Sequence, residues 1–186
     1  MTYTQITNKV AQQTPDIEQV FDMTNMRRPP AQHEAMDWAS VSGAVPIGSH
    51  ILTLDGSLPV DHLYPGDRII TRAGARRLAT VTRIELSADT EIVRMTRNAL
   101  GGRPDRDLCL LPGQMIRVSD WRAQALWDVA DAVVPVSKLV DGDYIRHGTT
   151  SAGDAMIHLS FDTEEIIYVD GLEVVAAATQ PFTVTA

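Results

Sequence analysis

The sequence contains very little cysteine, few aromatic residues and no long apolar run. Of its 186 residues, one is a cysteine, Cys109, and 5% are aromatic. A single cysteine cannot form an internal disulfide bond or build a zinc site of several thiolates. No stretch reaches the ~18 apolar residues of a membrane span, and the polar start MTYTQITNKVAQQ lacks the apolar segment of a secretory signal. We therefore expect no membrane partner and a cytoplasmic location.

Charge is distributed unevenly along the chain, whose formal net charge is −8. Residues 68–122 carry 11 basic and 6 acidic side chains, whereas residues 123–186 carry 2 basic and 10 acidic ones. A basic segment can contact phosphate, but no set of aromatic side chains suited to base stacking accompanies these arginines. We therefore expect no nucleic-acid partner. The basic segment then faces either the acidic C-terminal third or solvent.

The first 43 residues differ from the rest of the chain. They are polar, are interrupted by Pro29-Pro30, and contain Thr14-Pro15-Asp16, which is typical of a helix start. We expect an N-terminal tail or short helix over residues 1–43, which could dock on a β domain over residues 44–186.

From Gly48 onward, the sequence pattern predicts short strands separated by turns. The predicted strands cover residues 50–54, 68–71, 79–86, 92–97, 108–111, 115–118, 157–161, 166–169 and 172–176. Asp170-Gly171 predicts a hairpin between the last two, and only residues 121–131 and 135–140 indicate helix. Many short strands with few helices predict an all-β domain. We expect Leu52 and Leu54 in its core, capped by Trp121 and Trp127.

No common catalytic or cofactor motif occurs in the chain. There is no G-x-S-x-G, no G-x-G-x-x-G and no phosphate-binding P-loop, and the five histidines are not paired at helical spacing. Cys109 lies in the apolar run 108–111, which is typical of a small buried hydrophobic residue rather than a nucleophile. These patterns predict neither a metal site nor a cofactor.

Four segments, in this order and spacing, resemble the Hint module that the Hedgehog autoprocessing region and inteins share. They are GSHILTLDG (48–56), VDHLYPGDRIITRAG (60–74), WRAQALWDVADAVVPVSKLVDGD (121–143) and HLSFDTEEIIYVDGL (158–172). The resemblance is to the bacterial stand-alone type and covers about residues 44–176. It implies a pseudo-symmetric all-β horseshoe of short strands. It also implies a self-directed acyl shift, in which a Cys or Ser at the module's start attacks the preceding carbonyl while an internal histidine polarises the amide.

The positions that match the family's catalytic residues hold other side chains. Ala44 stands at the nucleophile position, Gln114 at the internal histidine, and Glu164 at a further histidine. Alanine carries no nucleophile, and glutamine can hydrogen-bond a carbonyl but cannot transfer a proton near neutral pH. The resemblance therefore implies a degenerate active site that has lost self-cleavage.

We expect the former cleft to persist as a binding site for a protein or peptide, including the chain's own N-terminal tail. Its expected lining is Ser49, His50, Gln114, His158 and Asp162. Two alternatives stay open. One is residual self-cleavage with Ser42 or Ser49 as the nucleophile, and the other is an assembly subunit whose strand edges pair with acidic partners. No pattern in the sequence fixes an oligomeric state.

Overall fold

The computed structural model describes residues 42–179. The expected tail or helix over residues 1–43 therefore lies outside the described residues, apart from Ser42 and Gly43. Within the described range the strands are β1 (Ala44–Pro46), β2 (His50–Thr53), β3 (Gly56–Pro59), β4 (Arg68–Thr71), β5 (Gly74–Arg77), β6 (Thr80–Glu85), β7 (Glu91–Met95), β8 (Leu108–Leu110), β9 (Met115–Val118), β10 (Ala132–Pro135), β11 (Ile145–Thr149), β12 (Ala155–Phe161), β13 (Glu165–Val169) and β14 (Leu172–Ala178). The helices are η3 (Val60–His62), α1 (Trp121–Trp127) and η4 (Val136–Leu139), of which η3 and η4 are 3₁₀ helices.

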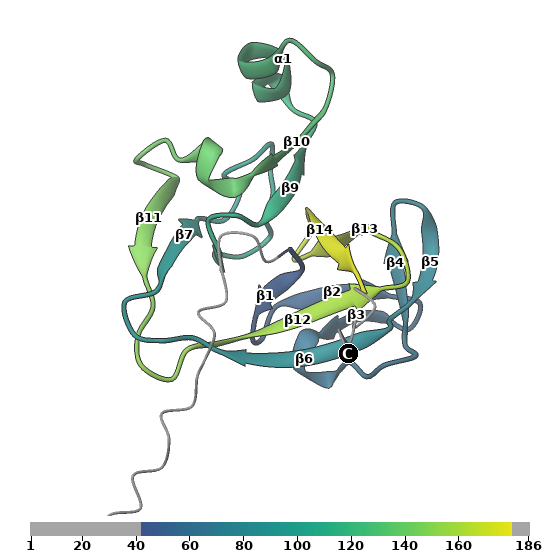
Figure 1. Ribbon diagram of the computed structural model, residues 1–186. Helices are drawn as coiled ribbons and strands as arrows, with labels where there is room; N and C mark the ends of the chain where they lie inside the picture. The colour runs from purple at the N-terminus through teal and green to yellow at the C-terminus, as the bar shows by residue number, and fades with distance from the viewer. Residues whose placement is uncertain (1–41, 180–186) are drawn as a thin grey trace, which may run out of the picture. The chain divides into compact units, whose positions relative to one another are not determined.

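These strands form two sheets (Figure 1). The larger sheet has the main order β1-β12-β14-β13-β2-β4-β5, with β3, β6, β9 and β10 paired to it at the sides, and the smaller sheet is β11-β7-β8. The β4–β5 hairpin lies at one end of the view, and β7 and β11 lie at the other. The all-β prediction is confirmed, and so is the hairpin at Asp170-Gly171, since Val169 pairs with Leu172.

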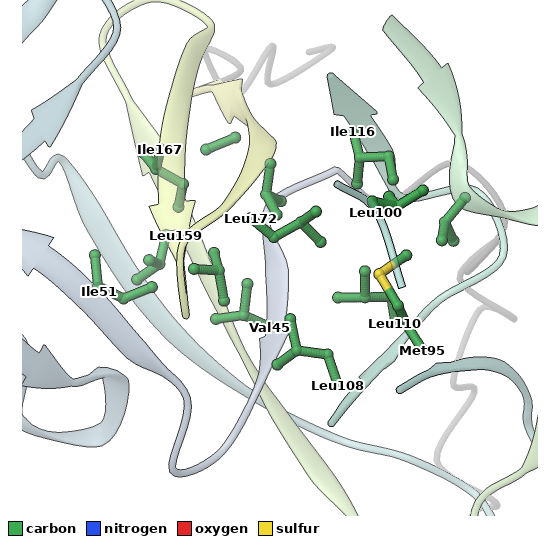
Figure 2. Close-up of a cluster of buried hydrophobic side chains, with 14 of the residues drawn as sticks. Val45, Ile51, Met95, Leu100, Leu108, Leu110, Ile116, Leu159, Ile167 and Leu172 are labelled. Atoms are coloured by element: carbon green, nitrogen blue, oxygen red, sulfur yellow. The ribbon is translucent and has the colours of Figure 1, made fainter. Parts of the chain in front are cut away.

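The core is built from aliphatic side chains that point inward from both halves of the larger sheet and from β7 and β8. Figure 2 shows Val45, Ile51, Leu110, Leu159 and Ile167 among them, and each is fully buried. Burial of this kind contributes roughly 1.5–3 kcal/mol per large aliphatic side chain. The packed strands fix the positions of the site residues that they carry.

The inward face of β2 is the opposite of the one predicted. Ile51 is fully buried, whereas Leu52 and Leu54 are 39% and 54% exposed. Successive side chains of a strand alternate between its faces, so a register error of one residue exchanges core and surface. The prediction that Leu52 and Leu54 lie in the core was therefore wrong.

Two predicted helical segments are shorter in the structure. The helix predicted over 121–131 ends at Trp127 because Asp128 adopts a left-handed conformation with φ 56°. The segment predicted over 135–140 is the 3₁₀ helix η4. Trp121 does not cap the core, since it is 70% exposed, while Trp127 packs against the core's rim.

Candidate functional site at the start of the domain

The chain enters the domain between β12 and β14. Strand β1 pairs antiparallel with β12, so that Ala44 lies opposite His158. The backbone N–H of Leu159 donates to the Gly43 carbonyl at 2.9 Å. Ala44 itself is fully buried in a small apolar cluster with Leu86, Ile92, Leu111 and Met156. The junction between the domain and what precedes it is thus part of the sheet.

Gln114 holds the junction from the side of β9. It follows the turn at Pro112-Gly113 and is fully buried. Its Oε1 accepts the Gly43 N–H at 2.8 Å, and its Nε2 donates to the carbonyls of Met115 at 2.9 Å and Val175 at 2.8 Å. An amide side chain has two donors and one carbonyl acceptor. Gln114 uses all of them, and the bonds join β9, β14 and the segment before β1.

His158 holds the junction from the side of β12. Its Nε2 lies 3.1 Å from the carbonyl oxygen of Ser42. A carbonyl can only accept, so Nε2 carries the hydrogen in this contact. Burial lowers the pKa of His158, and the bond to Ser42 opposes that shift only in part. The imidazole is therefore neutral at physiological pH.

The two side chains together grip one peptide group, the one that joins Ser42 to Gly43. His158 binds its carbonyl oxygen, and Gln114 binds its N–H. An acyl shift needs a donor to the carbonyl oxygen and a proton donor to the leaving nitrogen. Here His158 donates to the carbonyl oxygen, whereas Gln114 accepts from the N–H. The gripped peptide is one residue before the Gly43–Ala44 peptide that sequence matching places at the junction.

No side chain can stand at position 43 to attack that peptide. Gly43 has φ 93°, a conformation that residues with a Cβ rarely adopt. A Cβ there would lie 2.6 Å from the Leu159 carbonyl oxygen and 3.2 Å from the Ala176 Cα. The site therefore has the groups that hold an amide, but neither position 43 nor position 44 carries a nucleophilic side chain.

A family model described as a Hint domain matches residues 46–178. The chain belongs to the Hint domain family. A bacterial intein-like domain from Clostridium thermocellum is similar in structure, with 15% identity, a TM-score of 0.50, and coverage of 72% of this chain and 97% of that one. The AceL NrdHF class 3 split intein, in a splice-inactive variant, has 12% identity, a TM-score of 0.48, and coverage of 74% and 99%.

At these identities, the likeness to the Clostridium thermocellum domain shows the fold alone. It agrees with the all-β architecture described above. No curated protein matches this chain. Over residues 42–179, no helix combines the length and the apolar character that crossing a membrane requires.

The other predicted site residues do not gather around this junction of the Hint domain. Ser49 is buried in the turn before β2, where its backbone bonds to Pro46 and Val60. Asp162 and Glu164 are exposed in the turn between β12 and β13. Glu164 is thus exposed, whereas Gln114 is fully buried. Of the five residues expected to line the former cleft, His50 lies in the lining of the groove described next.

His50 lines a different feature, a groove of about 760 Å³ beside the β13–β14 hairpin. Its Nδ1 lies 3.1 Å from an Arg106 guanidinium nitrogen and 3.7 Å from a carboxylate oxygen of Asp170. The lining also contains Tyr168, Arg103 and further arginine and carboxylate side chains. Its volume exceeds that of the pocket that Cys109 lines, which is about 430 Å³.

Cys109 is half-buried beside a smaller pocket, and burial raises the pKa of its thiol while Arg94 opposes that shift. A thiol with a raised pKa is a poor nucleophile at neutral pH. Within residues 42–179, no three His, Cys, Asp or Glu side chains cluster so that they could hold a metal ion.

Sequence reasoning missed Gly43 and Val175 as members of the site. Gly43 contributes its backbone and its lack of a side chain, and Val175 contributes a carbonyl oxygen. Neither role leaves a motif in the sequence, because each depends on a contact across more than 60 residues.

Proposed function

We propose that this Hint domain no longer cuts its own chain and serves as a binding module for a protein or peptide. The observation that carries the proposal is the Ser42–Gly43 peptide, which Gln114 and His158 grip at both ends although neither Gly43 nor Ala44 carries a nucleophilic side chain. A gripped peptide that cannot react is a fixed attachment point for the segment that precedes the domain.

Two chemical roles of the family's reaction, the nucleophile and the proton donor to the leaving nitrogen, are unfilled at positions 44 and 114. Ala44 offers a methyl group, and it points into an apolar cluster. Gln114 cannot give a proton to a leaving amine near neutral pH. On β14, Val175 and Ala176 face the junction without a titratable group. Restoring the reaction would take several changes at once.

The groove beside the β13–β14 hairpin supports the binding part of the proposal. Its volume of about 760 Å³ lies in the range of ligand sites. Its lining combines arginines, carboxylates and hydroxyls with Leu52 and Tyr168. Such a mixture fits a protein or peptide segment better than a purely apolar ligand.

The test is the intact mass of the purified full chain, fresh and after long incubation with a thiol or with hydroxylamine, which both trap ester and thioester intermediates. We expect one unbroken species of 20.4 kDa in every sample. A fragment ending at residue 41 or 48 would overturn the proposal in favour of residual self-cleavage. Ser42→Ala and Ser49→Ala variants would then show which hydroxyl attacks.

Replacing Ala44 by cysteine sharpens this test. The new thiol would lie among Leu86, Ile92 and Met156, and the Gly43 carbonyl would stay bonded to Leu159 in the sheet. We expect Ala44→Cys to remain uncut under the same conditions. Cleavage between residues 43 and 44 would show that the missing nucleophile at position 44 alone accounts for the loss of self-cleavage.

A further inference from the structure

The outer face of β2, β4 and β13 presents apolar side chains to solvent. Thr53 pairs with Ile69 on β4, and Ile167 pairs with Thr71 on β4. Paired residues lie on the same face of a sheet, so all four lie on the inner face. The residues that alternate with these therefore point outward: Leu52 on β2, Leu54 directly after it, Ile70 on β4 and Tyr168 on β13. All four are at least partly exposed, Leu54 to 54%.

Two arginines flank this apolar centre on the β4–β5 hairpin. Arg68 and Arg77 are cross-strand partners, directly opposite each other, and both are exposed. Neither forms an ion pair with any side chain of residues 42–179. By contrast, the neighbouring Arg72 binds Glu173 at 2.8 Å, and Arg76 binds the buried Glu165 at 3.0 Å. The hairpin thus neutralises two of its arginines and leaves the opposed pair without a counter-charge in the described domain.

Like charges directly opposite each other destabilise an antiparallel pair. A carboxylate on a partner that lies over Arg68 and Arg77 would convert this repulsion into attraction. The same partner would bury Leu54 and Ile70, which lie beside the two arginines in the sheet. The face therefore combines an exposed apolar centre with an uncompensated positive rim.

We propose that this outer face, defined by Leu52, Leu54, Arg68, Ile70, Arg77 and Tyr168, docks an acidic segment of a partner protein that also carries aliphatic side chains. The inference rests on the proposed function of the domain as a binding module. The surface extends beyond the six residues. Leu52 and Tyr168 also line the groove, so the face is continuous with it. In the groove, Arg103 pairs with Asp105 and Arg106 lies 3.8 Å from Asp170, so the positive charge left for a partner is that of Arg68 and Arg77.

Charge complementarity favours this occupant over a nucleic acid. The centre of the face is aliphatic, with Tyr168 as its one aromatic ring, whereas single-stranded nucleic acids bind through several stacking rings and a basic groove. The glutamate and aspartate side chains of a protein segment can pair with the two arginines while its leucine or valine side chains cover the aliphatic centre.

The experiment uses the full chain and a fluorescein-labelled 16-residue peptide of alternating glutamate and leucine, followed by fluorescence anisotropy. We expect binding that weakens as salt is raised. We also expect at least about tenfold weaker binding to the Arg68→Glu/Arg77→Glu variant, because each rim charge is reversed. Leu52→Ser/Leu54→Ser should weaken binding as well. The matched control is Arg146→Glu on β11, an exposed arginine of the other sheet, which should stay within about twofold of the parent.

Several results would overturn the docking proposal. They are peptide affinity unchanged in both double variants, an equal loss in the Arg146→Glu control, or equally tight binding of a glutamate-serine peptide or an oligothymidylate of the same charge. Self-association in sedimentation that the double arginine variant abolishes would assign the face to a second copy instead. Circular dichroism melts confirm that each variant is folded.

The same samples separate this proposal from the proposed function. Intact mass reports whether the chain is uncut. A cut chain counts against the proposed function, whereas an uncut, folded chain that fails to bind the acidic peptide counts against the docking face alone.

Discussion

The junction and the outer face differ in how completely their polar groups are satisfied. At the junction, the fully buried Gln114 makes three hydrogen bonds, and the gripped peptide is bonded at both ends. On the outer face, Arg68 and Arg77 oppose each other in solvent beside exposed leucines. The junction is therefore closed, and its polar groups are paired internally. The interactions that a partner could complete lie on the outside of the sheet.

Removing the junction's central hydrogen-bonding group should have the largest effect. Gln114→Leu would leave the Gly43 N–H and the Val175 carbonyl without partners in the interior. An unpaired buried group costs about 1–3 kcal/mol, so we expect a loss of about 3 kcal/mol in the free energy of unfolding. Urea denaturation measures it. Gln124→Leu on the exposed surface of α1 is the control and should change stability by no more than about 0.5 kcal/mol.

Adding a methyl group at Gly43 should come next. Gly43→Ala combines the left-handed conformation with a contact of 2.6 Å to the Leu159 carbonyl oxygen. We expect a loss of about 2 kcal/mol or more in urea denaturation. Gly48 has a similar φ of 81°, but a Cβ there would meet nothing within 4 Å. Gly48→Ala should therefore cost only the conformational part, about 1 kcal/mol, and equal losses in the two variants would contradict the steric argument.

Turn residues explain why much of the fold is predictable from the sequence. Strands β4 and β9 have the bounds predicted for them, since Pro65-Gly66 and Pro112-Gly113 mark where each can begin. Strands β1, β3, β5, β10 and β11 were missed, because their short segments lack clear alternation. The inward face of β2 was also missed. Leu52 and Leu54 are as apolar as Ile51, so composition alone could not choose between the two faces.

The junction was predictable only in part, for a different reason. Matching the motif pointed to Gln114, and the structure places that side chain against the segment before β1. The motif could not show that the gripped peptide is Ser42–Gly43, since that depends on the register of β1 against β12. Nor could it show that Glu164 faces solvent, because the turn after Phe161 decides which way residues 162–164 point.

His158 makes the stability of the junction depend on pH. Because burial lowers its pKa in the folded state, the unfolded chain binds a proton more readily. Stability from this group is therefore complete above the ordinary histidine pKa of about 6.5 and is lost as the pH falls through the folded value. We expect the melting temperature to drop less between pH 7 and pH 5 in His158→Gln than in the parent. Gln124→Leu on α1, which changes no titratable side chain, is the control that should keep the parent's drop.

The smallest expected effect is a gain in stability from a substitution on the outer face. Arg77→Glu would place a carboxylate directly across the strand pair from Arg68, where two positive charges now face each other. Opposite charges at such a position stabilise a sheet by roughly 0.2–1 kcal/mol relative to a neutral pair, and like charges destabilise it. We therefore expect Arg77→Glu to raise the melting temperature slightly while it weakens binding of the acidic peptide. If Arg77 served only the fold, replacing it would not make the protein more stable. A fall in both the melting temperature and the peptide affinity would therefore contradict the proposal that this arginine pair binds a partner.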